Sequence, residues 1–296
     1  CFLYAFYVFT QLGARCEMKL QRFENASEFY DRVKDYLLSQ EAMHNLLLGI
    51  ANTLIHHPER YKSQPYLAIV EIDRDIVAVA MRTPPYDLVL SQSKNLDAVK
   101  AIAQDLYLVS ESISAVNGPT FESEAFAQAW CSLTGKSYQL KMAMRAFQLE
   151  QVHHISQAPG YLRLAIDSDQ ELLLRWFEAF CLEAVGKVES DPQAWINHHL
   201  QQQAVYLWQD EVTVSMVSRG QLTPHGVRIN LVYTPPEYRG KGYASACLAG
   251  LSQKLLDQGH KYCFLFTDLA NPTTNHIYQL IGYRPVGDWH NYCFIS

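Results

Sequence analysis

The stretch that most constrains the fold is residues 229–244, INLVYTPPEYRGKGYA, which predicts a strand, a sharp stop, a glycine loop and the start of a helix. Its first residues are β-branched and alternate in polarity, which is typical of a strand. Pro235 and Pro236 end this strand, because proline has no N–H to donate and its φ is fixed. From Tyr243 onward apolar residues recur at helical spacing, and Gly259 suits the C-terminal cap.

The glycine loop predicts an anionic ligand. A helix that begins directly after glycines offers free N–H groups and the positive end of its dipole. Gly240 and Gly242 let the backbone turn tightly without a side chain in the way. Arg239 and Lys241 add mobile positive charge beside them. We therefore expect a phosphate or a pyrophosphate here.

Spacing separates three kinds of phosphate loop. A Walker-type loop needs Ser or Thr after its Gly-Lys pair, whereas Lys241 is followed by Gly242. A dinucleotide fingerprint with Asp268 as its acid comes close, but too little chain follows for the remaining βα units. The third pattern, Arg-x-x-Gly-x-Ala, is filled by Arg239, Gly242 and Ala244. For the loop taken alone, an ordinary strand–helix turn stays open as well.

The chain after this helix carries a second pattern. Residues 261–267 form a continuous apolar run, as expected of a buried strand. A short helix is expected over 273–281, with Thr273 or Thr274 as its cap, and Gly282 ends it. The whole ending 271–283 reads NPTTNHIYQLIGY.

Together these two segments resemble the signatures of the GCN5-related N-acetyltransferase (GNAT) superfamily. The Arg-x-x-Gly-x-Ala loop is similar to its acyl-CoA pyrophosphate loop, and 271–283 resembles its second signature, an Asn, a Leu-Tyr-like pair and Gly-Phe or Gly-Tyr. The resemblance covers roughly residues 161–296. It implies an α/β (α+β) fold with a mixed, mostly antiparallel sheet flanked by helices.

The resemblance also implies acetyl-CoA as co-substrate. In this superfamily the strand before the glycine loop diverges from the strand after the helix, and the pantetheine arm lies in the V-shaped slot between them. The loop amides hold the pyrophosphate, and a strand N–H near the thioester stabilises the oxyanion. The cofactor-binding residues carried over by position are Leu231, Val232, Tyr233, Thr234, Arg239, Gly240, Lys241, Gly242, Tyr243, Ala244 and Asn271.

Tyr278 matches the superfamily tyrosine that protonates the departing thiolate, and it is the expected catalytic residue. A phenol, with a pKa of about 10, is close enough to a thiol, at about 8.5, to return a proton. The alternative for Tyr278 is a helix tyrosine that packs on the sheet. The alternative for Asn271 is a turn, because Asn-Pro commonly starts one.

No motif identifies the general base that would take a proton from the amine. The candidates by position are Glu183, Glu189, Glu211, His225 and Glu237. Asn230, on the central strand, is a further candidate to face the acceptor.

The resulting reading is an N-acetyltransferase that moves an acetyl group from acetyl-CoA to a primary amine by direct attack through a tetrahedral intermediate. The acceptor is a small molecule or a peptide. The alternatives are a module that senses acyl-CoA without catalysis, and a scaffold, which the intact glycine loop disfavours.

Composition narrows the partners. The net charge of −6 over 296 residues disfavours nucleic acid. The apolar run 2–9 is too short to span a membrane and lacks the basic start of a signal peptide, so no membrane partner is expected. Seven cysteines without a C-x-x-C pair indicate thiols in a reducing cytoplasm. Three histidine doublets, at 56–57, 153–154 and 198–199, have no accompanying carboxylate cluster, so no metal is expected.

The sequence predicts two tandem lobes. Residues 1–17 are expected to lie outside the native domain, 18–150 to form a first lobe, 151–160 a linker, and 161–296 the lobe that binds acyl-CoA.

Predicted element order is the same in both lobes, and residues 75–81 align with 210–216 without a gap. A strand over 113–116 is expected to be broken by the Asn-Gly-Pro at 117–119. Where the second lobe has its glycine loop, the first has Ser91–Asn95, which contains no glycine. The first lobe is therefore expected to be degenerate.

Overall fold

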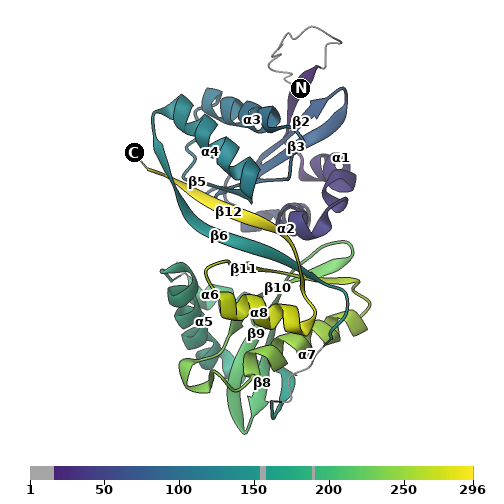
Figure 1. The fold of residues 1–296 in the computed structure, drawn as a ribbon, viewed down its shortest axis with the longest axis vertical. Helices are drawn as coiled ribbons and strands as arrows, with labels where there is room; N and C mark the ends of the chain where they lie inside the picture. The colour runs from purple at the N-terminus through teal and green to yellow at the C-terminus, as the bar shows by residue number, and fades with distance from the viewer. Residues whose placement is uncertain (1–16, 154–157, 189–190, 296) are drawn as a thin grey trace. The chain divides into compact units, whose positions relative to one another are not determined.

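The computed structural model describes residues 17–153, 158–188 and 191–295 (Figure 1). The predicted N-terminal extension lies outside the described residues except for residue 17, and so do residues 154–157 of the predicted linker. Within the described part, no helix has the length and apolar character needed to cross a bilayer.

The chain forms two compact units. Unit 1 holds the described residues up to Ala146 together with 268–270 and 286–295, and unit 2 holds the remainder. The C-terminal strand therefore belongs to unit 1 and not to the lobe that the sequence suggested, because it pairs with a strand of unit 1, Trp289 opposite Pro119.

Unit 1 is a mixed sheet with helices packed on it. Its strands, in spatial order, are β1 (Met18–Phe23), β2 (Tyr66–Ile72), β3 (Asp75–Arg82), β4 (Leu88–Leu90), β5 (Ala115–Pro119), β12 (Arg284–Ile295) and β6 (Ser137–Leu149). Its helices are α1 (Ala26–Leu38), α2 (Glu41–His56), α3 (Leu96–Leu108) and α4 (Thr120–Thr134). Alternate residues of β2, Tyr66, Ala68 and Val70, pack in one apolar core with α3 and α4.

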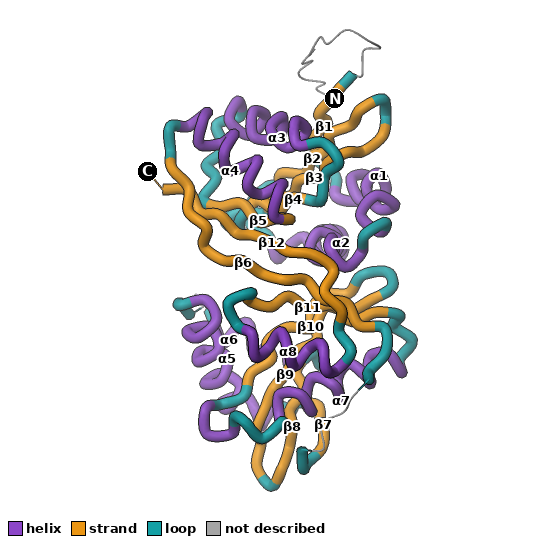
Figure 2. The backbone as a smooth tube through the Cα atoms, in the orientation of Figure 1, coloured by secondary structure: helices purple, strands orange, loops and turns teal. Residues whose placement is uncertain are grey.

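Unit 2 repeats this plan. Its strands, in spatial order, are β11 (Tyr262–Asp268), β10 (Gly226–Tyr233), β9 (Val212–Leu222), β8 (Val205–Asp210) and β7 (Tyr161–Leu164). Its helices are α5 (Gln170–Val185), α6 (Pro192–Gln201), α7 (Tyr243–Asp257) and α8 (Pro272–Ile281), drawn in purple in Figure 2. Mixed, mostly antiparallel sheets flanked by helices confirm the predicted fold class.

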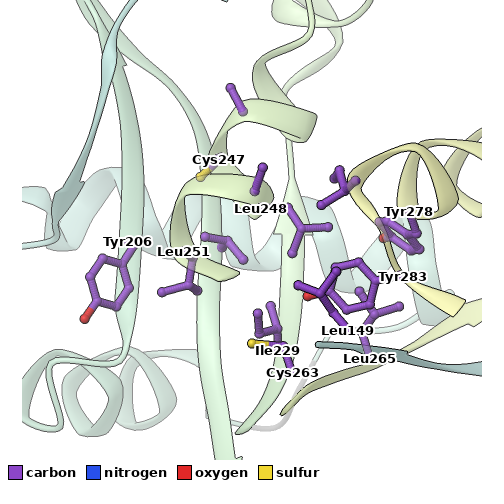
Figure 3. Packing of buried hydrophobic residues seen from close by; sticks show 14 of the residues in the cluster. Leu149, Tyr206, Ile229, Cys247, Leu248, Leu251, Cys263, Leu265, Tyr278 and Tyr283 are labelled. Atoms are coloured by element: carbon purple, nitrogen blue, oxygen red, sulfur yellow. The ribbon is translucent and has the colours of Figure 1, made fainter. Parts of the chain in front are cut away.

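Each face of the unit 2 sheet has its own apolar core. On one face α7 and α8 pack on the sheet, with Leu248 and Leu251 beside Ile229 and Leu265 (Figure 3). On the other face α5 and α6 pack on Leu207 and other residues of β8, β9 and β10. The candidate functional site lies at the C-terminal end of β10, between these two cores.

Both units run through the same order of elements. Along the chain, β1 to β6 and β7 to β12 each run through a strand, two helices, three strands, a helix, a strand, a helix and a final strand, leaving short 3₁₀ turns aside. The final strand of the second run, β12, is the one that joins unit 1. Each also has its parallel pair at the same place, β4 with β5 and β10 with β11. The repetition that the sequence suggested is therefore present in the element order.

The gapless alignment of the hairpins, however, is wrong by two residues. Next to the register shift of each hairpin, Ala78 opposes Val70 and Ser215 opposes Trp208. Ala78 therefore corresponds to Ser215, whereas the alignment placed it at Thr213. The two turns differ in length, which sequence similarity alone did not reveal.

The predicted break in the strand after residue 116 is also wrong. Residues 117–119 continue β5, because β12 pairs with them on one side and β4 pairs with Asn117 on the other. Gly118 is needed there, since a Cβ would lie 3.0 Å from the Cβ of Leu90. Neighbouring strands thus override the turn preference of Asn-Gly-Pro.

Gly226 is the residue that allows β10 and β11 to pair. A side chain at this position would overlap the Phe264 ring of β11. We expect Gly226→Ala to lower the free energy of unfolding by about 1–3 kcal/mol, because overpacking strains a filled site.

Gly250 in α7 is the matched control, since a Cβ there would meet its nearest atom, in the Trp208 ring, at 3.5 Å, an ordinary contact. Gly250→Ala should stabilise the helix by about 0.5–1 kcal/mol. Chemical denaturation measures the free energy of unfolding of both variants. Equal changes in the two would show that Gly226 is not needed for β10 and β11 to pair.

Candidate functional site

Strand β10 carries a bulge that the sequence did not announce. Its register with β9 shifts between Asn230 and Tyr233, and Leu231 has a φ of +54°. For a residue with a Cβ this left-handed conformation costs roughly 1–2 kcal/mol. Such strain collects at functional sites. A glycine would have signalled the bulge in the sequence, but a leucine gives no such signal.

The bulge reverses which face of the sheet the odd-numbered side chains of β10 occupy. Val227 and Ile229 belong to the core under α7, whereas Leu231 and Tyr233 belong to the core with α5. Strict alternation would keep all four side chains on one face. Leu231 and Val232 lie between the last two register pairs with β9 and are not register partners of any β9 residue themselves.

The two strands then separate. β10 pairs with β11 only from Gly226 to Arg228, and within the described part no residue beyond Arg228 pairs with β11. The expected divergence is therefore present, and the edge of β10 from Ile229 onward has no strand beside it on this side. Of the predicted edge residues, Tyr233 already accepts a hydrogen bond at its carbonyl from Ser215 Oγ, at 3.1 Å.

The glycine loop leads into α7 without a side-chain cap. Gly240 and Gly242 both have positive φ, +76° and +81°, and Gly242 is the N-cap residue. Within the described part, no acceptor is paired with the N–H groups of Tyr243, Ala244 and Ser245. These three amides at the positive end of the helix dipole can bind an anion.

Arg239 does not supply the mobile charge that the sequence suggested. Its Nε donates to the carbonyl of Thr234 at 2.8 Å, and its Nη2 donates to Glu183 of α5 at 2.6 Å. This contact with Glu183 raises the pKa of Arg239. The side chain therefore braces the loop, while Lys241 is exposed, with its ammonium 5.8 Å from the Tyr238 ring centroid.

The side chain of Tyr243 also has a structural role. Its hydroxyl donates to Asp210 at the end of β8 at 2.6 Å, and this hydrogen bond raises the pKa of the phenol. Ser215 and Thr234 are joined by a 2.9 Å hydrogen bond between their hydroxyls. The side chains around the loop thus position its backbone.

Tyr278 lies on α8 within the apolar core under α7 (Figure 3). Its ring packs edge-on against Phe147, at 6.0 Å between centroids, and beside Tyr283. Burial raises the pKa of Tyr278 to about 12. The phenol is therefore protonated at neutral pH, which is the form that a general acid needs.

Asn271 is the N-cap of α8. Its Oδ1 accepts from the N–H of Thr274 at 3.1 Å, with Pro272 at the first helical position. The prediction that Thr273 or Thr274 caps this helix is wrong, because the helix begins one residue earlier than expected. The side-chain oxygen of Asn271 is thus already in use.

The base candidates lie at the surface or are paired. Glu211, His225 and Glu237 are exposed, and Glu183 is bound to Arg239. Glu189 lies outside the described residues. Among the residues described here, there is also no cluster of three or more His, Cys, Asp or Glu that could hold a metal.

The equivalent loop of unit 1 has its amides occupied. The N–H of Gln92 donates to Nε2 of His44 at 3.0 Å, and the N–H of Ser93 donates to Glu122 at 2.6 Å. Burial lowers the pKa of His44 to about 4, so its ring is neutral and can accept. Asn95 caps α3 by accepting from the N–H of Asp97. Protein groups thus fill the positions that unit 2 leaves open.

Comparison with known proteins agrees with this geometry. Residues 170–283 match the model of the acetyltransferase (GNAT) family. No curated protein matches the sequence significantly.

Solved structures share the fold along nearly the whole chain. An acetyltransferase from the GNAT family from Colwellia psychrerythraea has a TM-score of 0.58 and 12% identity, over 94% of this chain and 100% of that one. A GCN5-related N-acetyltransferase from Sphaerobacter thermophilus has a TM-score of 0.62 and 13% identity, over 93% of this chain and 94% of that one. A tandem GNAT protein from the clavulanic acid biosynthesis pathway has a TM-score of 0.52 and 11% identity, over 93% of this chain and 98% of that one. At these identities the likeness concerns the fold alone.

The open N-terminus of α7 predicts the effect of Gly242→Asp. The new carboxylate would cap the helix and repel an anion, so we expect coenzyme A to bind more than about 100-fold more weakly in calorimetry.

Gly259 offers a matched control at the other end of α7. It too has positive φ, +94°, and a Cβ there would meet nothing within 4 Å. Gly259→Asp adds the same charge and similar strain away from the loop, and it should leave the affinity unchanged. Equal losses in both variants would contradict the assigned site.

Proposed function

We propose that this chain, whose residues 170–283 match the model of the acetyltransferase (GNAT) family, moves an acetyl group from acetyl-CoA to a primary amine. The observation that carries the proposal is the uncapped start of α7 behind two glycines of positive φ. Three free amides and the helix dipole suit a pyrophosphate, which is the part of coenzyme A that the GNAT loop holds.

The residues proposed to hold acetyl-CoA form two groups. The backbone of Arg239–Ala244 would bind the pyrophosphate, and the edge of β10 over Leu231–Thr234 would pair with the pantetheine arm. Asn271 would act through its amide nitrogen, because its oxygen caps α8. The lack of a β11 neighbour beyond Arg228 supports this assignment.

The proposed chemistry is direct transfer. The amine nitrogen attacks the thioester carbonyl carbon, the carbonyl oxygen becomes an oxyanion, and the intermediate collapses as the C–S bond breaks. Backbone N–H groups at the Leu231 bulge are outside the β9 register and would stabilise the oxyanion.

Tyr278 is the proposed acid for the departing thiolate. Its pKa of about 12 keeps the proton on the phenol until it is needed. A free thiol has a pKa of about 8.5, and burial in an apolar slot raises the pKa of a thiol as well. Burial would therefore raise the pKa of the phenol and the pKa of the thiol together, which keeps proton transfer between them feasible.

An acyl-CoA sensor is the second candidate. One observation favours it: among the described residues, the carboxylate and imidazole candidates for the base are exposed or paired. An amine could instead lose its proton to water or to an exposed group through a water molecule. Release of coenzyme A on adding an amine separates the two functions.

We also propose that unit 1 does not bind acyl-CoA. The carboxylate of Glu122 already accepts from Ser93, and the Asn95 side chain already caps α3. A phosphate at the Ser91–Asn95 loop would have to displace the carboxylate of Glu122, and it would find no cluster of free amides there.

The first test concerns Tyr278→Phe. Without the hydroxyl, kcat for thiol release should fall by about 100-fold or more, while the KM for acetyl-CoA and the unfolding free energy stay nearly unchanged. Stability should persist because the ring keeps its packing on Phe147.

Tyr283→Phe is the matched control in the same aromatic group. It removes a buried 2.8 Å hydrogen bond between the hydroxyls of Tyr283 and Ser252, so it should cost about 1 kcal/mol of stability and leave kcat unchanged. The same kcat in both variants would remove Tyr278 from the mechanism.

The second test is the stoichiometry. Calorimetric titration with acetyl-CoA should give one site per chain, because only unit 2 has free loop amides among the described residues. The Gly242→Asp variant should show none. A second site of similar affinity would show that unit 1 is functional.

A further inference from the structure

Arg228 is a partly buried cation with no anionic partner in the described part of the chain. Its Nε is fully buried and has no hydrogen-bond acceptor within the described part of the chain. Its guanidinium lies 5.1 Å from the centroid of the Phe266 ring of β11. Burial lowers the pKa of this guanidinium to about 10, so the group keeps its charge at neutral pH.

The position of Arg228 ties it to the proposed reaction. Arg228 opposes Phe264 in the last register pair before β10 and β11 separate, and it precedes the Leu231 bulge by three residues. At about 3.3 Å per residue, its Cα lies about 10 Å along the strand from the bulge. An arginine side chain can span most of that distance.

Arg228 lies on the face of β10 that is opposite to α7. Its neighbours Val227 and Ile229 point into the core under α7, which is filled by apolar side chains. Arg228 and Asn230 therefore point to the opposite face. A polar acceptor that contacts Arg228 and Asn230 must therefore approach from the face on which α5 and α6 pack farther along the sheet.

Two further polar groups beside Arg228 lack partners. The Oδ1 of Asn230 and the Oε1 of Gln221 are buried without a donor in the described part. Gln221 lies where the β9 register shifts opposite Arg228. The Asn230 amide lies against Gly220, where a Cβ would be 3.1 Å from its Nδ2, so any larger residue would displace it.

These unpaired groups are costly in the protein alone. A buried charge is normally paired, and a buried oxygen without a donor loses about 1–3 kcal/mol. The Phe266 ring offsets part of the cost of Arg228 through a cation–π contact. A ligand with an anion for the guanidinium and N–H donors for the two oxygens would satisfy all three groups.

On the basis of the proposed acetyl transfer, we propose that Arg228 and Asn230 are the specificity determinants of the acceptor site and that the acceptor is an amine that also carries a carboxylate. The guanidinium binds the carboxylate through two parallel hydrogen bonds. The amine N–H groups donate to Oδ1 of Asn230, which holds the nitrogen beside the strand edge where the thioester would lie.

The test compares amino acids with their own amides as acceptors. Alanine, lysine and 4-aminobutyrate are each paired with the matching amide, and coenzyme A release is measured. The wild-type protein should prefer at least one of the acids over its amide by about 10- to 100-fold in kcat/KM, as expected for losing a charged hydrogen-bond pair.

Arg228→Met keeps the length and apolar stem of the side chain but removes its charge. It should bring the acid-to-amide ratio close to one, leave the KM for acetyl-CoA unchanged and keep or raise Tm, because removing an unpaired buried charge does not destabilise. Arg228→Lys should restore part of the ratio. A lower Tm with an unchanged ratio would assign Arg228 a structural role and overturn the proposal.

Arg219 provides the matched control on the neighbouring strand. Its Nη2 donates to the carbonyl of Gln202 at 2.9 Å, so its charge is engaged away from Arg228. Arg219→Met should leave the acid-to-amide ratio unchanged. A third arm uses aminomethylphosphonate beside glycine, and a preference for the phosphonate would overturn the carboxylate assignment.

A binding measurement separates this proposal from the proposed function. Calorimetry with the same acids is carried out on protein saturated with coenzyme A, where no transfer occurs. Binding that is lost in Arg228→Met supports the acceptor site even if no amine releases thiol, which would refute catalysis alone. If no acid binds and no acid is preferred over its amide, the acceptor site is refuted, whether or not amides are acetylated.

Discussion

The candidate site depends on backbone groups that the fold leaves without partners. β10 loses its neighbour β11 after Arg228, and the Leu231 bulge takes the next residues out of the β9 ladder. A few residues later α7 begins without a cap. Unpaired amides are normally costly, so two such places in succession indicate a ligand that supplies the missing acceptors. The surrounding side chains, Arg239 above all, hold this backbone in place.

The two units show how one plan can lead to two outcomes. Both have a parallel strand pair joined by a helix at the same point in the element order. In unit 1 the amide of Ser93 binds Glu122 and Asn95 caps its helix, so the loop is closed by the protein itself. In unit 2 Gly242 takes the cap position, and no side chain substitutes for the anion. The presence of a few acceptor side chains therefore decides whether the loop stays open.

Much of this could be predicted from the sequence. Periodicity and turn residues located β10, α7, β11 and α8, and the order of two local signatures indicated the fold. The errors arose where distant strands decide the outcome. Residues 117–119 continue β5 because β4 and β12 flank them, and 286–295 join unit 1 because they pair with β5. Arg239 was expected to carry a mobile charge, whereas its side chain pairs with Glu183, which is far away in sequence.

The sequence by itself determined the glycine loop, the helix behind it and the residue types that suit an anionic ligand, because turn geometry and helix periodicity are local. Only the tertiary structure decided that Leu231 adopts a left-handed conformation, that burial raises the pKa of Tyr278, and that Nε of Arg228 has no acceptor among the described residues. These properties depend on which distant groups surround a residue. Solvation and charge pairing arise from neighbours in space, and a linear sequence does not name those neighbours.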